Sequence, residues 1–386
     1  MLLNKQVMPL VFVFAIASQA IAEINGAPAK TSTLEQLLQA WRAGTQKSTS
    51  GAVKKTCSSL IDCESAVTYG NLSEKAYAAG VLSTMGASAV PALTKALTDE
   101  NEHIRDIAAT SLRRIGPDAK DAIPALIKLL GDNATFRTAQ DALGSIGKAA
   151  IPDLIALFPE PEEGTETKEA KSQRWRIRRR AVSVFGAIGA VAVPELIEIL
   201  NSENDDGLSQ DFAAEALGDI GPAAKDAVPA LIQHITESNR YRKKSKQNLG
   251  QYQWTLKNTL ITLRESDITW GASALGKIGP DAKDAVPKLL SLLQGIKDEE
   301  FNLNKHVLVE ALGGIGAASS ASVPTLIQLL KDPNADVRLV TIVALGKMGP
   351  AAQEAKVNLE AIAKYADSEQ VKSAAKTAIS KISSKS

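Results

Sequence analysis

The chain has 386 residues, of which 45 % are hydrophobic and only 4 % aromatic, and its formal net charge is +1. This hydrophobic content is sufficient for an ordered core of Ala, Leu, Ile and Val, which excludes an intrinsically disordered chain. The balanced charge argues against nucleic acid as a partner, because nucleic-acid binding needs a basic surface.

Residues 1–22 have the pattern of a signal peptide for export. Lys5 precedes the apolar stretch Val7–Ala17, and Ala20–Ala22 provides a small-x-small cleavage pattern before Glu23. Cleavage removes Lys5 and no acid, which leaves 43 basic and 43 acidic residues. We expect an exported, periplasmic or secreted protein with no transmembrane segment in the mature chain. An uncleaved N-terminal anchor is the alternative.

Residues 23–75 lack the repeat found later and are expected to form an N-terminal cap. A capping-box pattern at Ser32–Glu35 predicts a short helix that reaches Arg42. Cys57 and Cys63 are the only cysteines, and export favours a disulfide between them. In a straight helix six residues rise about 9 Å, which is too far for a disulfide, so a bend is required there. Two reduced, buried thiols are the alternative.

One sequence block recurs along the rest of the chain. The block at Gly116–Leu130 reappears almost unchanged at Gly221 and Gly279, and looser copies begin at Gly86, Gly147, Gly189, Gly316 and Gly349. A unit that recurs every 30–40 residues predicts a stack of small modules that share one continuous core. We therefore expect residues 76–382 to form a repeat array.

Each repeat reads as two helices joined by a connector. A glycine ends the first helix, and a proline opens the second in most units, at Pro124, Pro152, Pro194, Pro229, Pro287 and Pro324. The glycine and proline are five residues apart at Gly86, Gly147 and Gly189 and eight apart at Gly116, Gly221, Gly279 and Gly316. Val371–Ile382 predicts a closing amphipathic helix.

Three stretches between units are longer than the expected loop: Pro159–Ile177, Thr236–Asp267 and Gln294–His306. The middle one contains a predicted helix around Tyr252–Leu263. Each follows a second helix and precedes a first helix, so we expect all three insertions along the same edge of the array.

The segments Asp332–Pro350 (D-P-N-A-D-V-R and A-L-G-K-M-G-P) and Gly279–Leu290 (G-P-D-A-K-D-A-V-P-K-L-L) resemble bacterial HEAT-like repeats, especially the phycobilisome-lyase type. The resemblance implies an all-α, right-handed α-solenoid of about eight two-helix HEAT-like repeats. It also implies a protein-interaction scaffold, because most members are scaffolds or binding modules. One alternative is a lyase or chaperone-like factor for a cofactor-bearing protein, since some members attach bilins.

Catalytic motifs are missing from the sequence. Neither nucleophile elbows nor phosphate loops nor zinc-protease helices occur. The three histidines, His103, His234 and His306, are followed by Ile, Ile and Val, so the His-Glu pairs of di-iron HEAT-like hydroxylases are absent. We therefore predict a non-enzymatic protein with no cofactor and no metal site.

Two basic clusters with interleaved aromatics are the candidate partner-binding residues. They are Arg174, Trp175, Arg176, Arg178, Arg179 and Arg180 in the first cluster, and Arg240, Tyr241, Arg242, Lys243 and Lys244 in the second. Arginine pairs with carboxylate, phosphate or sulfate, so an anionic polymer or lipid headgroup is a further alternative partner. The competing interpretation is a solvated loop neutralised by Glu160, Glu162, Glu163 and Glu166.

Acidic and basic residues at the start of some units predict ladders between neighbouring units. Arg105 and Asp99 form one such set, and Arg338, Asp336 and Asp332 form another. Exposed pairs of this kind contribute about 0–1 kcal/mol each, so we expect them to align units rather than bind ligands.

Overall fold

The computed structural model describes residues 57, 59–159, 167–202, 208–236, 268–296 and 302–384. Residue contacts divide the chain into two units, Met1–Val81 and Leu82–Ser386. The predicted signal peptide, the predicted helix that starts near Ser32 and the predicted helix around Tyr252–Leu263 lie outside the described residues.

In the first unit, α4 (Leu60–Tyr69) and α5 (Leu72–Leu82) follow the cysteine segment. Ser59 caps α4 through a capping box, because its Oγ accepts from the N–H of Asp62 at 3.2 Å and Asp62 Oδ2 accepts from the N–H of Ser59 at 3.1 Å. The cap creates the bend that the cysteine spacing requires. Cys57 lies before this turn and is disulfide-bonded to Cys63, with Cα atoms 4.4 Å apart.

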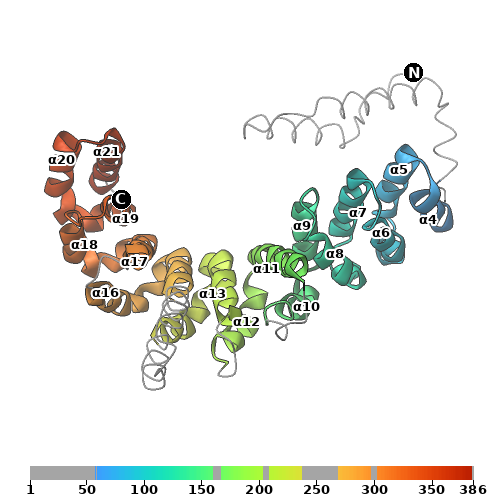
Figure 1. Ribbon diagram of the computed structural model, residues 1–386, viewed down its shortest axis with the longest axis horizontal. Coiled ribbons are helices and arrows are strands. Elements are labelled where there is room, and N and C mark those ends of the chain that lie inside the picture. Colours follow the sequence, from blue (N-terminus) through green and yellow to red (C-terminus); the bar gives the residue numbers. More distant parts are fainter. Residues whose placement is uncertain are drawn as a thin grey trace. The chain divides into compact units, whose positions relative to one another are not determined.

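The second unit is a row of helix pairs (Figure 1). The first helices are α7 (Glu102–Ile115), α9 (Phe136–Ile146), α11 (Lys168–Ile188), α13 (Leu208–Ile220), residues 268–278, α17 (Asn302–Ile315) and α19 (Ala335–Met348). The second helices are α6 (Val90–Ala96), α8 (Ile123–Leu129), α10 (Ile151–Ile155), α12 (Val193–Leu200), residues 228–236, α16 (Val286–Gly295), α18 (Val323–Leu329) and α20 (Lys356–Tyr365). The described residues contain no β-strand, which confirms the all-α solenoid.

A 3₁₀ connector joins the two helices of every unit. Among the described residues, eight glycines with φ between 60° and 83° mark the ends of first helices, in agreement with the prediction of about eight repeats. A positive φ at this point favours glycine because a Cβ would be strained there. The two predicted lengths are confirmed: η1 (Gly86–Ala89), η3 (Gly147–Ala150) and η4 (Gly189–Ala192) have four residues, whereas η2 (Gly116–Ala122), η5 (Gly221–Ala227), η6 (Gly279–Ala285), η8 (Gly316–Ser322) and η9 (Gly349–Ala355) have seven.

First helices pack against the first helices of neighbouring units, as α7 does on α9, α9 on α11 and α17 on α19. Small residues allow this approach. A Cβ added to Gly276 would lie 2.8 Å from Cα of Ala311, and one added to Gly313 would lie 2.7 Å from Cα of Ala344. The row ends with α21 (Glu369–Ser383), which packs on α19 and α20 and buries only Ala375, Ala378 and Ile382. This is the predicted closing helix, and it includes the whole predicted range Val371–Ile382.

Two of the expected insertions are shorter than predicted. Helix α11 already begins at Lys168, within the insertion Pro159–Ile177, and α17 begins at Asn302, within Gln294–His306. In α11, polar residues that look like loop in the sequence form exposed first turns, from Lys168 to Gln173.

Two helical stretches, Lys168–Leu200 and Asn304–Leu329, are long and apolar enough to cross a membrane by length and composition. Each is a helix pair rather than one straight helix, because Gly189 (φ 77°) and Gly316 (φ 69°) end the first helix of the pair. Core helices of repeat layers pass the same test because they are buried against their neighbours. The absence of a membrane-spanning segment after residue 22 stays a prediction.

Candidate functional site

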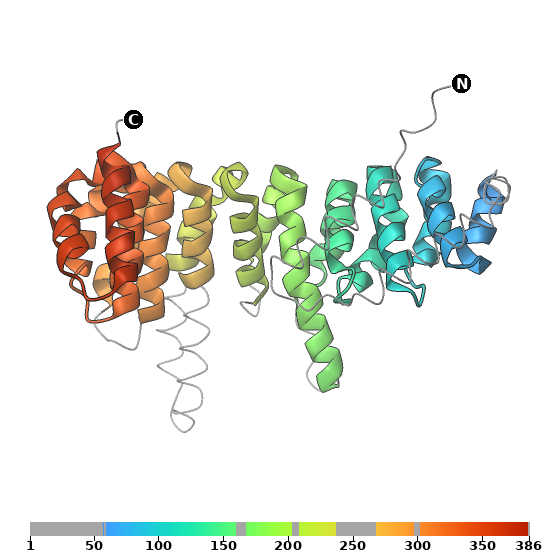
Figure 2. The same ribbon diagram turned by 90° about the horizontal axis from the view of Figure 1, so that it is seen from above.

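The regular layers are interrupted at α11, which has 21 residues where α7 has 14, α9 has 11 and α13 has 13. Thr167 starts the helix, and its side chain accepts a hydrogen bond from the N–H of Ala170 at 3.2 Å. Figure 2 shows α11 (green) extending beyond the neighbouring helices. The first predicted basic cluster lies on this helix, so its residues are held in helical spacing rather than in a solvated loop.

Arg178 is completely buried and is the largest buried side chain of the described residues. Its Nε donates to the carbonyl of Leu157 and its Nη2 to the carbonyl of Pro159, where α10 ends. Phe212 covers it, with the guanidinium carbon 5.9 Å from the ring centroid. Arg178 is therefore unavailable to a partner, which corrects the prediction made from the sequence.

The role of Arg178 belongs to the repeat. Eleven residues before the connector glycine, other units carry Arg105, Gln210 and Arg338. Each donates to main-chain carbonyls that follow the preceding second helix, as Arg105 does to Asp99 and Glu100 at 2.9 and 3.0 Å. These carbonyls have no partner within their own helix, so a side-chain donor satisfies them. The alignment of Arg178 with Arg105 and Arg338 in the repeat could have indicated this structural role, but the prediction considered only the cluster of basic residues.

Arg180 has a related structural role one unit further back. Its Nη1 donates to the carbonyl of Leu130 at 2.6 Å and its Nη2 to Oδ1 of Asn133 at 2.7 Å, and the guanidinium lies 3.9 Å from the ring centroid of Phe136. Phe136 occupies the position where other units carry the capping arginine. Burial and the neighbouring charge of Arg176 lower the pKa of Arg180, against the opposing effect of Asp132.

Arg179 points to the next unit. Its Nη2 lies 3.7 Å from Oε1 of Glu215, and its guanidinium carbon lies 5.7 Å from the ring centroid of Trp270. Burial raises the pKa of Glu215, and Arg179 partly offsets this rise. Arg179 is half-exposed, so it both links two units and remains part of the surface.

Trp175 and Arg176 are exposed, like Arg179, and Arg174 is half-buried. Trp175 is 44 % exposed, and its indole meets the ring of Phe212 edge-on, with the ring centroids 5.6 Å apart. The second cluster, from Arg240 to Lys244, lies outside the described residues.

An aromatic cluster beneath Trp175 was missed from the sequence. Phe158 lies 5.8 Å from Phe185 and 5.4 Å from Phe212, measured between ring centroids. Phe158 stands six residues after Pro152, a position that holds Leu97, Leu130, Leu200 and Leu330 in other units. This Leu-to-Phe change in an aromatic-poor chain was the available signal. The larger rings fill the space beside the short helix α10.

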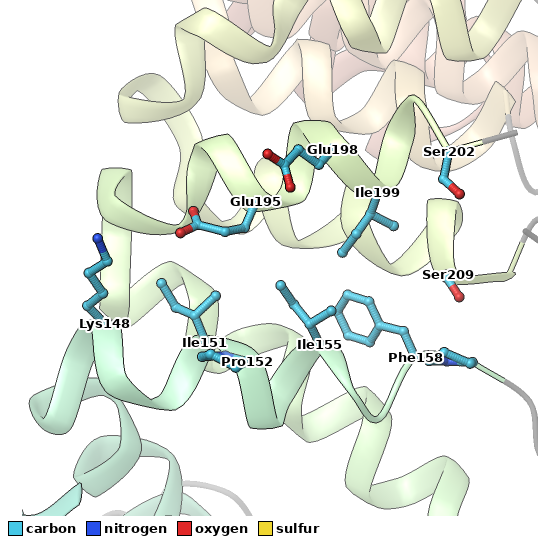
Figure 3. A pocket seen from close by; sticks show the side chains of 11 residues that line it. Lys148, Ile151, Pro152, Ile155, Phe158, Glu195, Glu198, Ile199, Ser202 and Ser209 are labelled. Atoms are coloured by element: carbon cyan, nitrogen blue, oxygen red, sulfur yellow. The ribbon is translucent and has the colours of Figure 1, made fainter. Parts of the chain in front are cut away.

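A groove of about 450 Å³ opens between α10 and α12 (Figure 3). Its lining combines apolar side chains with a few polar ones. The lining residues are Lys148, Ile151, Pro152, Ile155, Phe158, Pro159, Glu195, Glu198, Ile199, Ser202 and Ser209. The groove exists because α10 has only five residues, whereas α12 has eight and runs past its end.

The predicted ladders link units through different atoms than expected. The guanidinium of Arg105 pairs with Asp132 of the next unit at 2.6 Å, and its Nη1 donates to the carbonyl of Asp99 at 2.9 Å. Likewise, Arg338 donates to the carbonyl of Asp332 at 2.7 Å, and the carboxylate of Asp332 pairs with Lys305 at 3.1 Å.

The histidines do not converge. His103 and His306 are half-buried on separate helices, and His234 is buried with Nε2 3.8 Å from Oδ1 of Asp211. Within the described ranges, no group of three or more His, Cys, Asp or Glu side chains is arranged to hold a metal ion.

Comparisons with known proteins place the chain by its repeats. The family model for HEAT repeats matches residues 70–147 and 286–380, and that for the PBS lyase HEAT-like repeat matches residues 177–202. Curated protein sequences provide no significant match.

Solved structures with a similar fold include importin beta, at 15 % identity and a TM-score of 0.44, covering 84 % of this chain and 40 % of that one. The karyopherin Kap121p, solved bound to the SUMO protease Ulp1p, matches at 11 % identity and a TM-score of 0.36, covering 86 % and 49 %. An engineered protein matches at 18 % identity and a TM-score of 0.31, covering 76 % and 96 %. This chain thus spans less than half the length of importin beta or Kap121p.

Proposed function

Because the chain belongs to the HEAT-repeat proteins, we propose that it is a non-enzymatic scaffold that binds a protein partner outside the cytoplasm. Stacked repeats present extended surfaces suited to binding other proteins. The observation that carries the proposal is the projecting first half of α11, with Trp175 and Arg176 on its surface. Tryptophan and arginine are the residue types enriched where protein interfaces draw most of their binding energy.

The proposed partner surface consists of Lys171, Trp175, Arg176 and Arg179, which we call the α11 surface. All four are exposed. Trp175 rests on Phe212 and is thereby held in place, so little side-chain entropy is lost when a partner covers it. Three positive charges around the ring favour a partner with an acidic patch.

The extracytoplasmic setting is supported by two features. The first 22 residues have the charge, apolar stretch and small-residue cleavage pattern of an export signal. Cys57 and Cys63 form a disulfide, and disulfides persist in oxidising compartments outside the cytoplasm.

The proposal is tested by affinity capture with the mature protein, residues 23–386, from the envelope fraction of its own cell. Variants carrying Trp175→Ala and Arg176→Ser should lose a protein that the wild type retains. The matched control is Lys364→Ser with Tyr365→Ala, which removes another exposed cation–aromatic pair, with Nζ 5.0 Å from the ring centroid, at the far end of the array.

The substitution of Trp175 also removes a contact with Phe212, so a second variant leaves the ring in place. Lys171→Glu with Arg176→Glu reverses charge on the α11 surface only, and it should also abolish capture. Equal capture by the wild type and both variants would refute this surface. Release of the protein by a soluble anionic polymer, with no protein captured, would favour the polymer-binding alternative. Capture of a cofactor-bearing protein whose cofactor loading then changes would favour the lyase or chaperone-like alternative.

A further inference from the structure

The groove between α10 and α12 has two facing rows of side chains. Ile151, Ile155 and Phe158 follow one another along α10 and its end, whereas Glu195, Glu198 and Ile199 recur at helical spacing on α12 and Ser202 follows the end of that helix. Figure 3 shows these two rows on opposite sides of the opening. Residues three and four apart lie on one face of a helix, so the row on α12 is continuous.

The length of the groove limits what it can hold. From Glu195 to Ile199 the helix rises about 6 Å, and with the residues beyond its end this matches about two to three residues of an extended chain. A volume of about 450 Å³ falls in the range of ligand pockets. A groove of this size suits one side chain of a partner and the backbone on either side of it.

Two polar atoms in the groove lack hydrogen-bond partners among the described residues. They are Oε2 of Glu195 and Oγ of Ser209, and each is buried. The Ser209 side chain is only 3 % exposed. A buried polar atom without a partner is energetically unfavourable, so a ligand that supplies a donor to both would gain affinity.

The charge of the groove selects a cationic ligand. The residues lining the groove include two acids, Glu195 and Glu198, and one base, Lys148, which lies at the same end as Glu195. The sequences that continue from Pro159 and Ser202 carry seven more acids and no base, namely Glu160, Glu162, Glu163, Glu166, Glu203, Asp205 and Asp206. These acids add to the negative charge of the sequence next to the groove and favour a cationic ligand over an anionic one.

We propose that this groove is a second docking site, which binds an extended peptide segment of a partner with one apolar side chain flanked by lysine or arginine. The apolar side chain packs on Ile155 and Ile199, which are partly exposed, and the cation meets Glu195 and Glu198. The residues lining the groove include none of the α11 surface. The groove lets the scaffold hold two partners, or two parts of one partner, at once.

The test uses fluorescence anisotropy with the full mature protein and three labelled peptides, whose cores are Lys-Leu-Lys, Glu-Leu-Glu and Lys-Ser-Lys between Gly-Ser ends. The first peptide should bind, and higher salt should weaken its binding. The other two should bind much more weakly. Equal binding of the first and second peptides would overturn the charge argument.

Variants localise the binding. The double variant Glu195→Gln with Glu198→Gln should bind the Lys-Leu-Lys peptide roughly tenfold more weakly than the wild type does. This corresponds to about 1.4 kcal/mol of binding free energy. The matched control is Glu354→Gln with Glu360→Gln, which neutralises two exposed glutamates near α20 and should leave binding unchanged. Ile155→Trp should block binding by filling the groove without any change in charge.

The α11 variants separate this proposal from the previous one. Trp175→Ala with Arg176→Ser should bind the Lys-Leu-Lys peptide as the wild type does, whether or not it has lost its captured partner. Undiminished peptide binding by both the glutamine pair and Ile155→Trp would overturn the groove as the site.

Discussion

Arg178 donates its Nε to the main-chain carbonyl of Leu157, 21 residues earlier in the chain, from a position with no exposed surface. This bond joins α11 to the end of α10 and is buried beneath Phe212. A charge so placed is stabilised only while its partners remain.

Replacement of Arg178 by Met should lower the free energy of unfolding by about 3 kcal/mol, because it leaves the carbonyls of Leu157 and Pro159 without their donor. Urea denaturation followed by circular dichroism measures the change. Arg176→Met, two residues earlier and exposed, should change stability by less than about 0.5 kcal/mol. Equal stability of the two variants would contradict the assigned role.

Gly276→Ala should be destabilising, because the new Cβ would lie 2.8 Å from Cα of Ala311 on the adjacent helix. Overpacking of this kind costs about 1–3 kcal/mol. Gly80→Ala is the matched control, since its Cβ would meet no described atom within 4 Å, and alanine is favoured over glycine in a helix by about 0.5–1 kcal/mol. The midpoint of thermal unfolding should therefore fall for Gly276→Ala and rise for Gly80→Ala.

The lowered pKa of Asp132 predicts that this residue makes a pH-dependent contribution to the free energy of unfolding. Burial alone would raise its pKa, but hydrogen bonds from the N–H of Ala134 and from the side chains of Arg105 and Thr135 lower it overall. A carboxyl with a lowered pKa in the folded state stabilises the protein above the unfolded value of about 3.9, and this contribution is lost as pH falls through the folded value.

Asp132→Asn should therefore be less stable than the wild type at pH 7, and the difference should shrink as pH falls below about 4. Urea titrations at several pH values measure it. Arg105→Met removes the same ion pair from the other side and should reduce the pH dependence in the same sense. A difference that stays constant down to pH 3 would contradict this interpretation.

The disulfide provides a test of the compartment and of local stability. Cys57 and Cys63 of the protein isolated from its envelope fraction should react with an alkylating agent only after reduction. Closing so short a loop stabilises by about 2 kcal/mol in the chain-entropy model, so the variant with both cysteines changed to Ser should unfold earlier in urea. Free thiols in the native protein would contradict both the disulfide and the exported state.

The sequence predicted much of the fold because the repeat carries its own local rules. Glycine with positive φ ends the first helix, as at Gly116 (φ 70°), and proline opens the second, as at Pro124. These preferences depend on backbone sterics within a few residues, so they can be read without knowledge of distant contacts.

The candidate site was less predictable, because charge alone does not show where a side chain lies. Arg176 and Arg178 are two residues apart in one basic cluster, yet one is exposed and the other is buried. The difference comes from which face of α11 meets the carbonyls after α10, and this is set by packing between units. In the repeat, Arg178 aligns with Arg105 and Arg338. This alignment indicates a structural role that the basic composition of the cluster does not.

By itself, the sequence determined an all-α array of eight two-helix repeats, the two connector lengths and the closing helix, because each follows from local backbone preferences and helical periodicity. Only the tertiary structure decided which arginines are structural and which are free to contact a partner. It alone showed the groove beside Glu195, because a groove is formed where the short α10 meets the longer α12. Such a difference between neighbouring units has no signature within either helix, since it depends on how far one runs past the other.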